Sequence, residues 1–374
     1  MHAKPDLRVE LKWNITRSGS VIADVIIRKN RHMKRTTRTI AAFGLLLTLG
    51  SVFADSLHAQ SEEFKVNVMS YNIHRGGVVY LKQPLSQTAK VIQKVKADIV
   101  GIQEPKSPKG FTTEKLAELL GWNHSENTRR GVILTSYEIV ENLDEGGIKV
   151  KLPTGQEAYV FSLHLPSHPY QPYQLLSIRP TWHKHTFDIE FIKTEAEAIQ
   201  WAKKARGREV SEILNQIRDI PDKEAPVFLV GDFNEPSYLD WTEAAAKSGR
   251  HPIKVEYPNS LAMIKAGFTD AYRSIYPDEM KHPGFTWSPK YKPAAPTTHY
   301  DRIDFVYFKG KGLTVKDVKI VGENNENADI VVTPYPSDHR AVVATFTVPN
   351  QPKSEKLEAN KPDAGDGKSP VATE

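Results

Sequence analysis

The sequence predicts a mixed α/β (α+β) fold in which helices cover the outside of stacked β-sheets. Strand-like segments outnumber helical ones, and they are short apolar runs that we expect to be buried on one face. Segments with helical periodicity lie between them along the chain. Asn, Asp, Glu or His residues stand at one end of six strand-like segments, which predicts a shared polar site.

The expected strands carry these polar residues where each apolar run begins or ends. In chain order the runs are 65–71, 98–103, 159–163, 227–230, 305–308 and 341–346. The polar residues beside them are, in the same order, Asn72, Glu104, His164, Asp232 with Asn234, Asp301 with Asp304, and Asp338 with His339. Brought together, these strand ends would form one hydrophilic, acid-rich pocket.

Four segments have the spacing of apolar residues that is typical of helices. They are 85–96, 112–120, 192–220 and 239–247, and Gly207 is a possible interruption of the third. The segment 166–191 has no clean period and contains several aromatic residues, histidines and prolines. Long irregular segments in compact domains are often functional. We expect a packed loop, either over the site or simply on the surface.

The most informative segment is Gly231–Asn234, which follows the apolar run 227–230. Side chains at positions i and i+2 of an extended segment point to the same face. Asp232 and Asn234 can therefore reach one ligand at the edge of a sheet. An acid and an amide in that position suit phosphate and metal chemistry better than core packing.

Composition restricts the classes of function. The chain has 374 residues and a formal net charge of +5, but residues 61–349 contain equal numbers of basic and acidic side chains. A neutral body gives no support for avid non-specific binding of nucleic acid, although it is compatible with a local basic groove. Cysteine is absent, which excludes disulfides, zinc–thiolate sites and a cysteine nucleophile.

The two ends of the chain differ in composition from the middle. Basic residues after Met33, the apolar run 40–49, and small residues near Ala54 and Ala59 predict a secretory signal peptide at about 33–59. We therefore expect an upstream extension and signal in 1–60, one catalytic domain in 61–349, and a disordered tail in 350–374. This order predicts a secreted or periplasmic protein, with an uncleaved amino-terminal anchor as the alternative.

The strand-end motifs together resemble the endonuclease/exonuclease/phosphatase superfamily, which includes deoxyribonuclease I, apurinic endonucleases and neutral sphingomyelinases. The matching motifs, in the order of that superfamily, are Ser70–Ile73, Gly101–Glu104, Leu163–His164, Gly231–Asn234, Tyr300–Phe305 and Ser337–His339. The resemblance covers roughly residues 64–348. It implies a four-layer sandwich of two mixed β-sheets flanked by helices, like deoxyribonuclease I, and an activity that depends on Mg²⁺ or Mn²⁺.

The resemblance also implies roles for individual residues. Glu104 would be a direct metal ligand, Asn72 would orient that carboxylate or touch the metal, and Asp338 would assist metal binding. Asp232 and Asn234 would flank the attacking water and a phosphate oxygen, and His164 would hydrogen-bond the phosphoryl group. His339 would be the acid/base histidine. Its carboxylate partner is either Asp301 or Asp304, because the superfamily uses both positions.

Three further residues are candidate substrate contacts. Arg129 could meet a phosphate, with a solvated surface pair as the alternative, and Trp287 could stack on substrate or belong to the core. Tyr170 lies in the irregular segment that could cover the site. We expect a monomeric phosphoesterase acting on a small or lipid-linked phosphate ester. The alternatives are a secreted nuclease for DNA or RNA, and an inactive binding module on the same fold.

Overall fold

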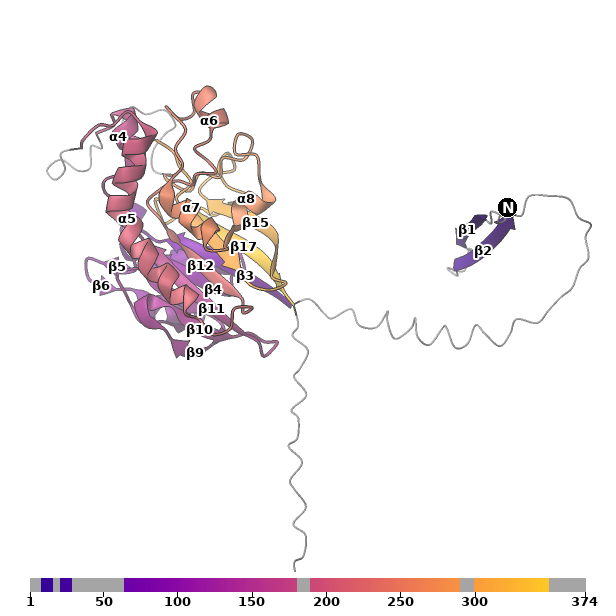
Figure 1. Cartoon of the computed structure of the whole chain (residues 1–374). Helices are drawn as coiled ribbons and strands as arrows, with labels where there is room; N and C mark the ends of the chain where they lie inside the picture. The colour runs from indigo at the N-terminus through magenta and orange to yellow at the C-terminus, as the bar shows by residue number, and fades with distance from the viewer. Residues whose placement is uncertain (1–7, 16–20, 29–63, 180–188, 290–298, 350–374) are drawn as a thin grey trace, which may run out of the picture. The chain divides into compact units, whose positions relative to one another are not determined.

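The computed structural model describes residues 8–15, 21–28, 64–179, 189–289 and 299–349 (Figure 1). The chain divides into two units, residues 1–60 and 61–374. In the first unit, β1 (Arg8–Ile15) pairs antiparallel with β2 (Val21–Arg28). The expected signal segment 33–59 and the expected tail 350–374 lie outside the described residues.

The second unit contains a seven-stranded sheet with the order β16-β15-β17-β3-β4-β8-β7. Strand β3 pairs parallel with β4 and antiparallel with β17, so the first and last long strands of this unit are neighbours. The strands of this sheet are β3 (Phe64–Asn72), β4 (Ile99–Gln103), β7 (Asn123–His124), β8 (Val132–Thr135), β15 (Thr314–Gly322), β16 (Ile330–Val331) and β17 (Ala341–Val348).

A six-stranded sheet with the order β13-β14-β12-β11-β10-β9 lies against the first. Strand β12 pairs parallel with β11 and antiparallel with β14. The strands are β9 (Glu138–Asn142), β10 (Ile148–Lys151), β11 (Glu157–His164), β12 (Val227–Asp232), β13 (Thr269–Asp270) and β14 (Asp304–Lys309). A small hairpin, β5 (Lys106–Ser107) with β6 (Gly110–Phe111), stands apart from both sheets.

The alternation of side chains along the strands builds the layers. On β12, Phe228 and Val230 belong to a core cluster that includes Val66 and Val68 of β3, so these residues pack between the two sheets. The intervening β12 residues face the other way: Leu229 belongs to a separate cluster with residues of the helices. Because both faces of both sheets are apolar, each sheet needs a helical cover on its outer side.

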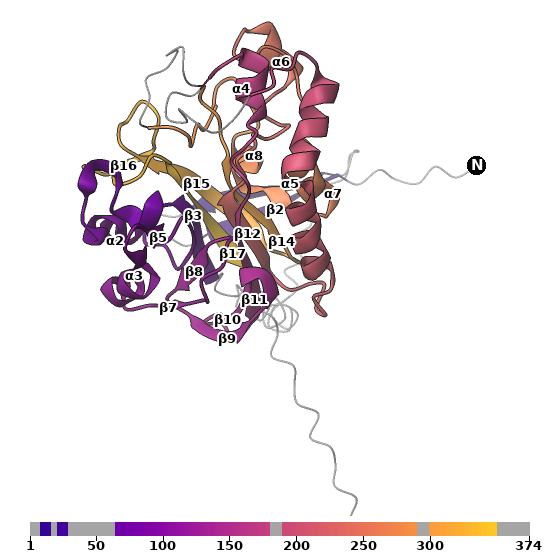
Figure 2. The same ribbon diagram turned by 90° about the vertical axis from the view of Figure 1, so that its left-hand side faces the viewer.

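The helices provide that cover. Helices α2 (Leu85–Lys94) and α3 (Thr113–Leu120) pack on the seven-stranded sheet, whereas α5 (Glu195–Arg218) and α7 (Pro258–Lys265) pack on the six-stranded sheet (Figure 2). The short helices are α4 (Gln171–Leu176), α6 (Glu243–Lys247), α8 (Ala271–Ile275) and the 3₁₀ turns Arg75–Gly77, Tyr80–Lys82 and Asp144–Gly146. The predicted four-layer sandwich is confirmed.

Two helices differ from the sequence-based expectation. Gly207 does not interrupt α5, which begins at a capping box formed by Thr194 and Glu197 and continues for 24 residues. The helix expected over 239–247 begins only at Glu243, because the Thr242 side chain accepts a hydrogen bond from Ala245 N–H and caps it there. Within the described ranges, no helix combines the length and apolar character needed to cross a bilayer.

Candidate active site

The register of three neighbouring strands brings the first site residues together. Asp232 at the end of β12 lies opposite His164 at the end of β11 and opposite Asp304 at the start of β14. Gly231 permits this close pairing, since a Cβ there would lie 2.1 Å from the carbonyl oxygen of Leu163. The six-stranded sheet therefore contributes a carboxylate, an imidazole and a second carboxylate at one edge.

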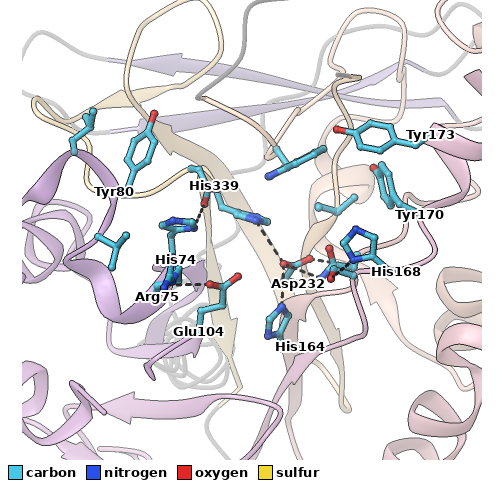
Figure 3. Close-up of a pocket in the computed structure, with 17 residues that line it drawn as sticks. His74, Arg75, Tyr80, Glu104, His164, His168, Tyr170, Tyr173, Asp232 and His339 are labelled. Carbon is cyan, nitrogen blue, oxygen red and sulfur yellow. Dashed lines mark hydrogen bonds and ion pairs between the residues drawn. The ribbon is translucent and has the colours of Figure 1, made fainter. Parts of the chain in front are cut away.

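Asp232 connects this edge to the other sheet (Figure 3). Its Oδ2 accepts a hydrogen bond from Asn72 Nδ2 at 2.9 Å, and Asn72 is the last residue of β3. The same oxygen lies 3.7 Å from Nε2 of both His164 and His339. The other oxygen, Oδ1, accepts from the Asn234 backbone N–H at 2.8 Å. Asp232 is 1% exposed and is the centre of the site.

Glu104 stands on the opposite side of the pocket, directly after β4. Its Oε2 accepts from the Arg75 backbone N–H at 3.0 Å, and its Oε1 accepts from Asn72 Nδ2 at 3.3 Å. The Asn72 amide thus orients both Glu104 and Asp232. Its own oxygen accepts from His74 N–H at 3.0 Å. Asn72 therefore contacts both carboxylates through its amide nitrogen.

Several of these residues adopt backbone conformations that are uncommon outside glycine. The φ angles of His74, Arg75, Glu104 and Asn234 are 51°, 51°, 55° and 47°, all in the left-handed region. Such conformations cost about 1–3 kcal/mol each and persist where the surroundings determine them. Here the Arg75 N–H donates to Glu104 and the Asn234 N–H donates to Asp232, and these hydrogen bonds stabilise the loops. The strained residues therefore lie directly beside the two carboxylates of the site.

The carboxylate partner of His339 is Asp304. The His339 Nδ1 lies 3.0 Å from Asp304 Oδ2, which leaves Nε2 facing Asp232. Burial opposes protonation of the imidazole, but the carboxylates of Asp304 and Asp232 outweigh burial and raise the pKa of His339 to about 10. Asp301 does not have this role, because its carboxylate accepts hydrogen bonds from Tyr170 and Trp241 instead.

The oxygen donors around Glu104 suit a hard divalent cation. Glu104 and Asp338 both line the pocket, and Asp338 Oδ1 lies 3.0 Å from His74 Nδ1. Asp232, Asp304 and His339 present ligand atoms that all lie within 4.8 Å of one another. Magnesium and manganese prefer such oxygen ligands and keep several waters, so a site with few protein carboxylates fits them.

The site opens into a cavity of about 770 Å³. Tyr80 forms one rim and Tyr170 with Tyr173 the opposite rim, and Trp287 packs against both of these tyrosines (Figure 3). Arg75 contributes the only Lys or Arg side chain among the described residues that line it. The lining residues are His74, Arg75, Val79, Tyr80, Leu81, Glu104, His164, Ser167, His168, Tyr170, Tyr173, Asp232, Asn234, Trp287, Ile303, Asp338 and His339.

The structure brings together most of the predicted residues and adds others. The residues that sequence reasoning missed include His74, Arg75, Tyr80 and Tyr173. His74 and Arg75 directly follow the strand that ends at Asn72, so their place in sequence was an available signal. Tyr80 belongs to a 3₁₀ turn whose position depends on the tertiary fold, and no local pattern indicates it.

Arg129, predicted as a phosphate contact, lies outside the pocket. Its guanidinium pairs with Glu209 at 2.8 Å and with Glu212 at 3.2 Å. Both glutamates stand on α5, so Arg129 fastens its loop to that helix. The alternative of a solvated pair of arginines is not observed either, because Arg129 forms these ion pairs and its neighbour Arg130 is buried and pairs with Glu212 at 2.8 Å.

Comparison with other proteins gives similar sequences and solved structures that cover 76% to 82% of this chain. The chain is 28% identical over 327 residues to an uncharacterized protein of Caenorhabditis elegans, F14F9.5, which covers 82% of this chain and 98% of that protein. TDP2 of D. rerio, solved with a single-strand DNA product, has 17% identity and a TM-score of 0.45, covering 76% of this chain and 99% of that one.

An AP endonuclease from Archaeoglobus fulgidus has 16% identity and a TM-score of 0.45, over 76% of this chain and 100% of that chain. Residues 69–339 match the model of the Endonuclease/Exonuclease/phosphatase family, which is more than half of the sequence. The resemblance in the sequence motifs is thereby confirmed. This chain belongs to the endonuclease/exonuclease/phosphatase family, whose members are metal-dependent phosphoesterases.

Proposed function

We propose that this protein hydrolyses a phosphodiester or phosphomonoester by attack of an activated water, with Mg²⁺ or Mn²⁺ as the cofactor. The observation that carries the proposal is the position of Asp232. Its buried carboxylate ends β12 of the six-stranded sheet and faces His164 of the neighbouring strand β11, whereas Asn72 and His339 reach it from the seven-stranded sheet. Such a carboxylate can orient and deprotonate a water that attacks a phosphorus atom between the two sides.

The surrounding groups would then stabilise the phosphoryl group as negative charge develops on it. His164 and Asn234 line the cavity beside Asp232. The His164 ring N–H can donate to a phosphate oxygen, and Asn234 Nδ2 would do so by exchanging its 3.3 Å contact with Asp232 Oδ2. Asp304 holds Nδ1 of His339, so a proton on Nε2 of His339 is directed toward the cavity. That proton is available to a phosphoryl oxygen or to the leaving group.

Glu104 is the proposed direct ligand of the cation. Asp338, which contacts His74 and lines the same cavity, is proposed to assist metal binding. Asn72 is proposed to contribute through the two carboxylates that it orients. A bound cation would neutralise charge on the phosphate oxygens, which is the contribution that hard divalent ions make to this chemistry.

The lining of the cavity favours a substrate that carries an apolar or aromatic group next to its phosphate. Tyr80, Tyr170, Tyr173 and Trp287 surround the opening, whereas Arg75 is the one Lys or Arg that the described residues contribute. A long nucleic acid duplex is normally bound through many Lys and Arg contacts to its phosphates. We therefore favour a small or lipid-linked phosphodiester over duplex DNA.

A nuclease for single strands is the second candidate. Aromatic side chains provide stacking surfaces for unpaired bases, and the four aromatic rings on the two rims of the cavity would serve this purpose. A non-catalytic binding module is the candidate from a different class. The retention of Glu104, Asp232, Asp304 and His339 in one hydrogen-bonded arrangement argues against it.

We also propose that the protein is exported and acts as a monomer outside the cytoplasm or in a periplasm. The sequence pattern of residues 33–59 supports export. Amino-terminal sequencing of the protein purified from its natural host tests this point. A mature chain that starts near residue 60 is expected, and a chain that retains residues 33–59 would contradict the proposal.

A substrate panel tests the proposed activity. Purified protein is incubated with a chromogenic phosphodiester, sphingomyelin, inositol phosphates, RNA, and single- and double-stranded DNA, each with magnesium and with a chelator. We expect magnesium-dependent hydrolysis of small or lipid-linked esters that exceeds hydrolysis of duplex DNA. Faster cleavage of single strands would favour the nuclease, and no hydrolysis of any ester would favour the binding module.

A further inference from the structure

We propose that His251, His299 and Asp301 form a second metal site, separate from the acidic site around Glu104 and suited to zinc or a similar transition metal. His251 Nδ1 and His299 Nε2 are 3.0 Å apart, and His299 Nε2 is 3.9 Å from Asp301 Oδ1. The three ligand atoms all lie within 4.8 Å of one another. Ions bound at about 2.0–2.2 Å by imidazole and carboxylate require a comparable spacing.

The charge of Asp301 is the second observation that points to a cation. Its side chain is 1% exposed, and the hydrogen bonds that the described residues donate to its carboxylate come from neutral groups, the Tyr170 hydroxyl at 2.6 Å and Trp241 Nε1 at 2.9 Å. The neighbouring Arg302 does not compensate it, because its guanidinium is engaged with Asp240 and Asp270. A buried carboxylate is costly without a positive partner, and a divalent ion would supply one.

The surroundings also hold the three ligands in position. The His251 ring stacks on Trp241 with 4.1 Å between ring centroids and an angle of 11°. Trp241 donates its N–H to the same Asp301 oxygen that lies nearest His299, and this oxygen keeps a second lone pair. Outer groups that orient ligands in this way are a regular feature of metal sites.

The donor set predicts the class of ion. Two imidazoles and one carboxylate are typical ligands of zinc, whereas magnesium prefers oxygen ligands alone. Without metal, one of the facing nitrogens, His251 Nδ1 or His299 Nε2, carries the hydrogen of the bond between them. On metal binding this ring can change tautomer and carry the hydrogen on its other nitrogen, so that both neutral rings present a lone pair to the ion. A fourth position would be filled by water. A bound ion would fix the position of Asp301. Through the hydrogen bond from the Tyr170 hydroxyl to Asp301, it would also fix the position of Tyr170, which lines the cavity.

Zinc binding by the full chain, in excess magnesium, tests the proposal without relying on catalysis. Chelator-treated protein is titrated with zinc by calorimetry, and with cobalt as a spectroscopic probe of nitrogen ligands. The Glu104→Gln variant is titrated in parallel, so that binding through Glu104 at the acidic site is weakened. We expect one tight equivalent in both proteins. The absence of a tight equivalent in Glu104→Gln would overturn the proposal.

Ligand variants identify the site. In a Glu104→Gln background, His299→Gln should weaken zinc binding by more than about 100-fold. The control His124→Gln, on the edge strand β7 of the seven-stranded sheet, should leave zinc binding unchanged. Trp241→Phe keeps an aromatic ring beside His251 but removes the N–H to Asp301, and should weaken binding about 10–100-fold. Unchanged affinity in folded His299→Gln or Trp241→Phe protein would contradict the assignment. Because binding is measured directly, a failed phosphoesterase assay would not affect this result.

Discussion

Asp301 and Asp304 stand close together in sequence but have different surroundings. Asp304 is the partner of His339, at 3.0 Å. Asp301 is turned away toward Tyr170 and Trp241. The sequence offered both residues as partners, because a three-residue motif does not define the direction of each side chain. The pairing with β12, which sets Asp304 opposite Asp232, decides between them.

Replacing each aspartate by asparagine separates the two roles. Asp304→Asn should lower kcat by about 10²–10⁴-fold, because His339 loses the carboxylate that orients its ring and stabilises its charged form. Asp301→Asn should instead lower the stability by about 1–3 kcal/mol, since two buried donors lose their charged acceptor. Steady-state kinetics and thermal melts measure both effects. A larger loss of kcat in Asp301→Asn than in Asp304→Asn would reverse the assignment.

Two arginines provide a second matched pair. Arg75 lines the cavity, whereas Arg129 pairs with Glu209 and Glu212 on α5. Arg75→Ala should lower kcat/KM by about 10–100-fold, the range expected for one lost charge-assisted contact to a phosphate. Arg129→Ala should leave kcat/KM unchanged. Equal effects of the two substitutions would show that the phosphate is bound elsewhere.

At the scale of the elements, β12 and α5 show what local pattern can and cannot predict. The apolar run of β12 and the acid at its end were evident in the sequence, because a buried strand is a short run of consecutive apolar residues bounded by turn residues. The irregular segment 166–191 predicted a packed loop but not whether that loop lies over the site, and its residues Tyr170 and Tyr173 line the cavity. Its position depends on Arg206 of α5, whose guanidinium donates to the carbonyl oxygens of Pro166 and Pro169. Such long-range contacts have no local pattern.

Two glycines should respond in opposite ways to substitution by alanine. Gly207 lies within α5, and an added Cβ would meet only the Lys203 Cβ at 3.8 Å. Gly207→Ala should therefore stabilise the protein by about 0.5–1 kcal/mol. Gly231→Ala should destabilise it by at least about 1–3 kcal/mol, since the new Cβ meets the Leu163 carbonyl oxygen. Urea unfolding of both variants provides the measurement, and a destabilised Gly207→Ala would contradict the continuous helix.

Glu235 links the loop after β12 to α7, and it makes stability depend on pH. Its carboxylate accepts from Asn259 N–H at 3.0 Å and from the Asn259 side chain at 2.6 Å, and burial raises its pKa from 4.5 to about 6. A carboxyl whose pKa is higher in the folded state than in the unfolded state favours folding at low pH. This contribution is lost as pH rises from about 4.5 to about 6.

Relative to Glu235→Gln, the free energy of unfolding of the wild type should fall by about 2 kcal/mol across that interval, the equivalent of its pKa shift. Chemical denaturation at a series of pH values measures the difference between the two proteins. The difference should be level above pH 6.5 or so. Parallel pH profiles of the wild type and the variant would contradict the raised pKa.

For the whole molecule, the sequence predicted the layers and the acidic site but not the walls of the cavity. Strand-end residues such as Asn72, Glu104 and Asp232 could be predicted, because parallel neighbouring strands end at the same edge of a sheet. In this fold the two sheets place these edges next to each other. The rims could not, since Tyr80 and Tyr173 come from short turns and helices whose positions depend on tertiary packing. The same limit explains why Arg129 was assigned to substrate: its acidic partners stand far along the chain on α5.

In the proposed function, the two sheets bring their acids together to hold a divalent cation against a phosphate. Magnesium titration of phosphodiester hydrolysis by the wild type and by Glu104→Gln tests it most directly. The wild type should show saturable activation by magnesium and no activity with chelator. Glu104→Gln should keep its melting temperature within a few degrees, require more magnesium, and turn over at least about 100-fold more slowly. Hydrolysis that persists with chelator, or a folded Glu104→Gln with wild-type activation by magnesium, would contradict the claim.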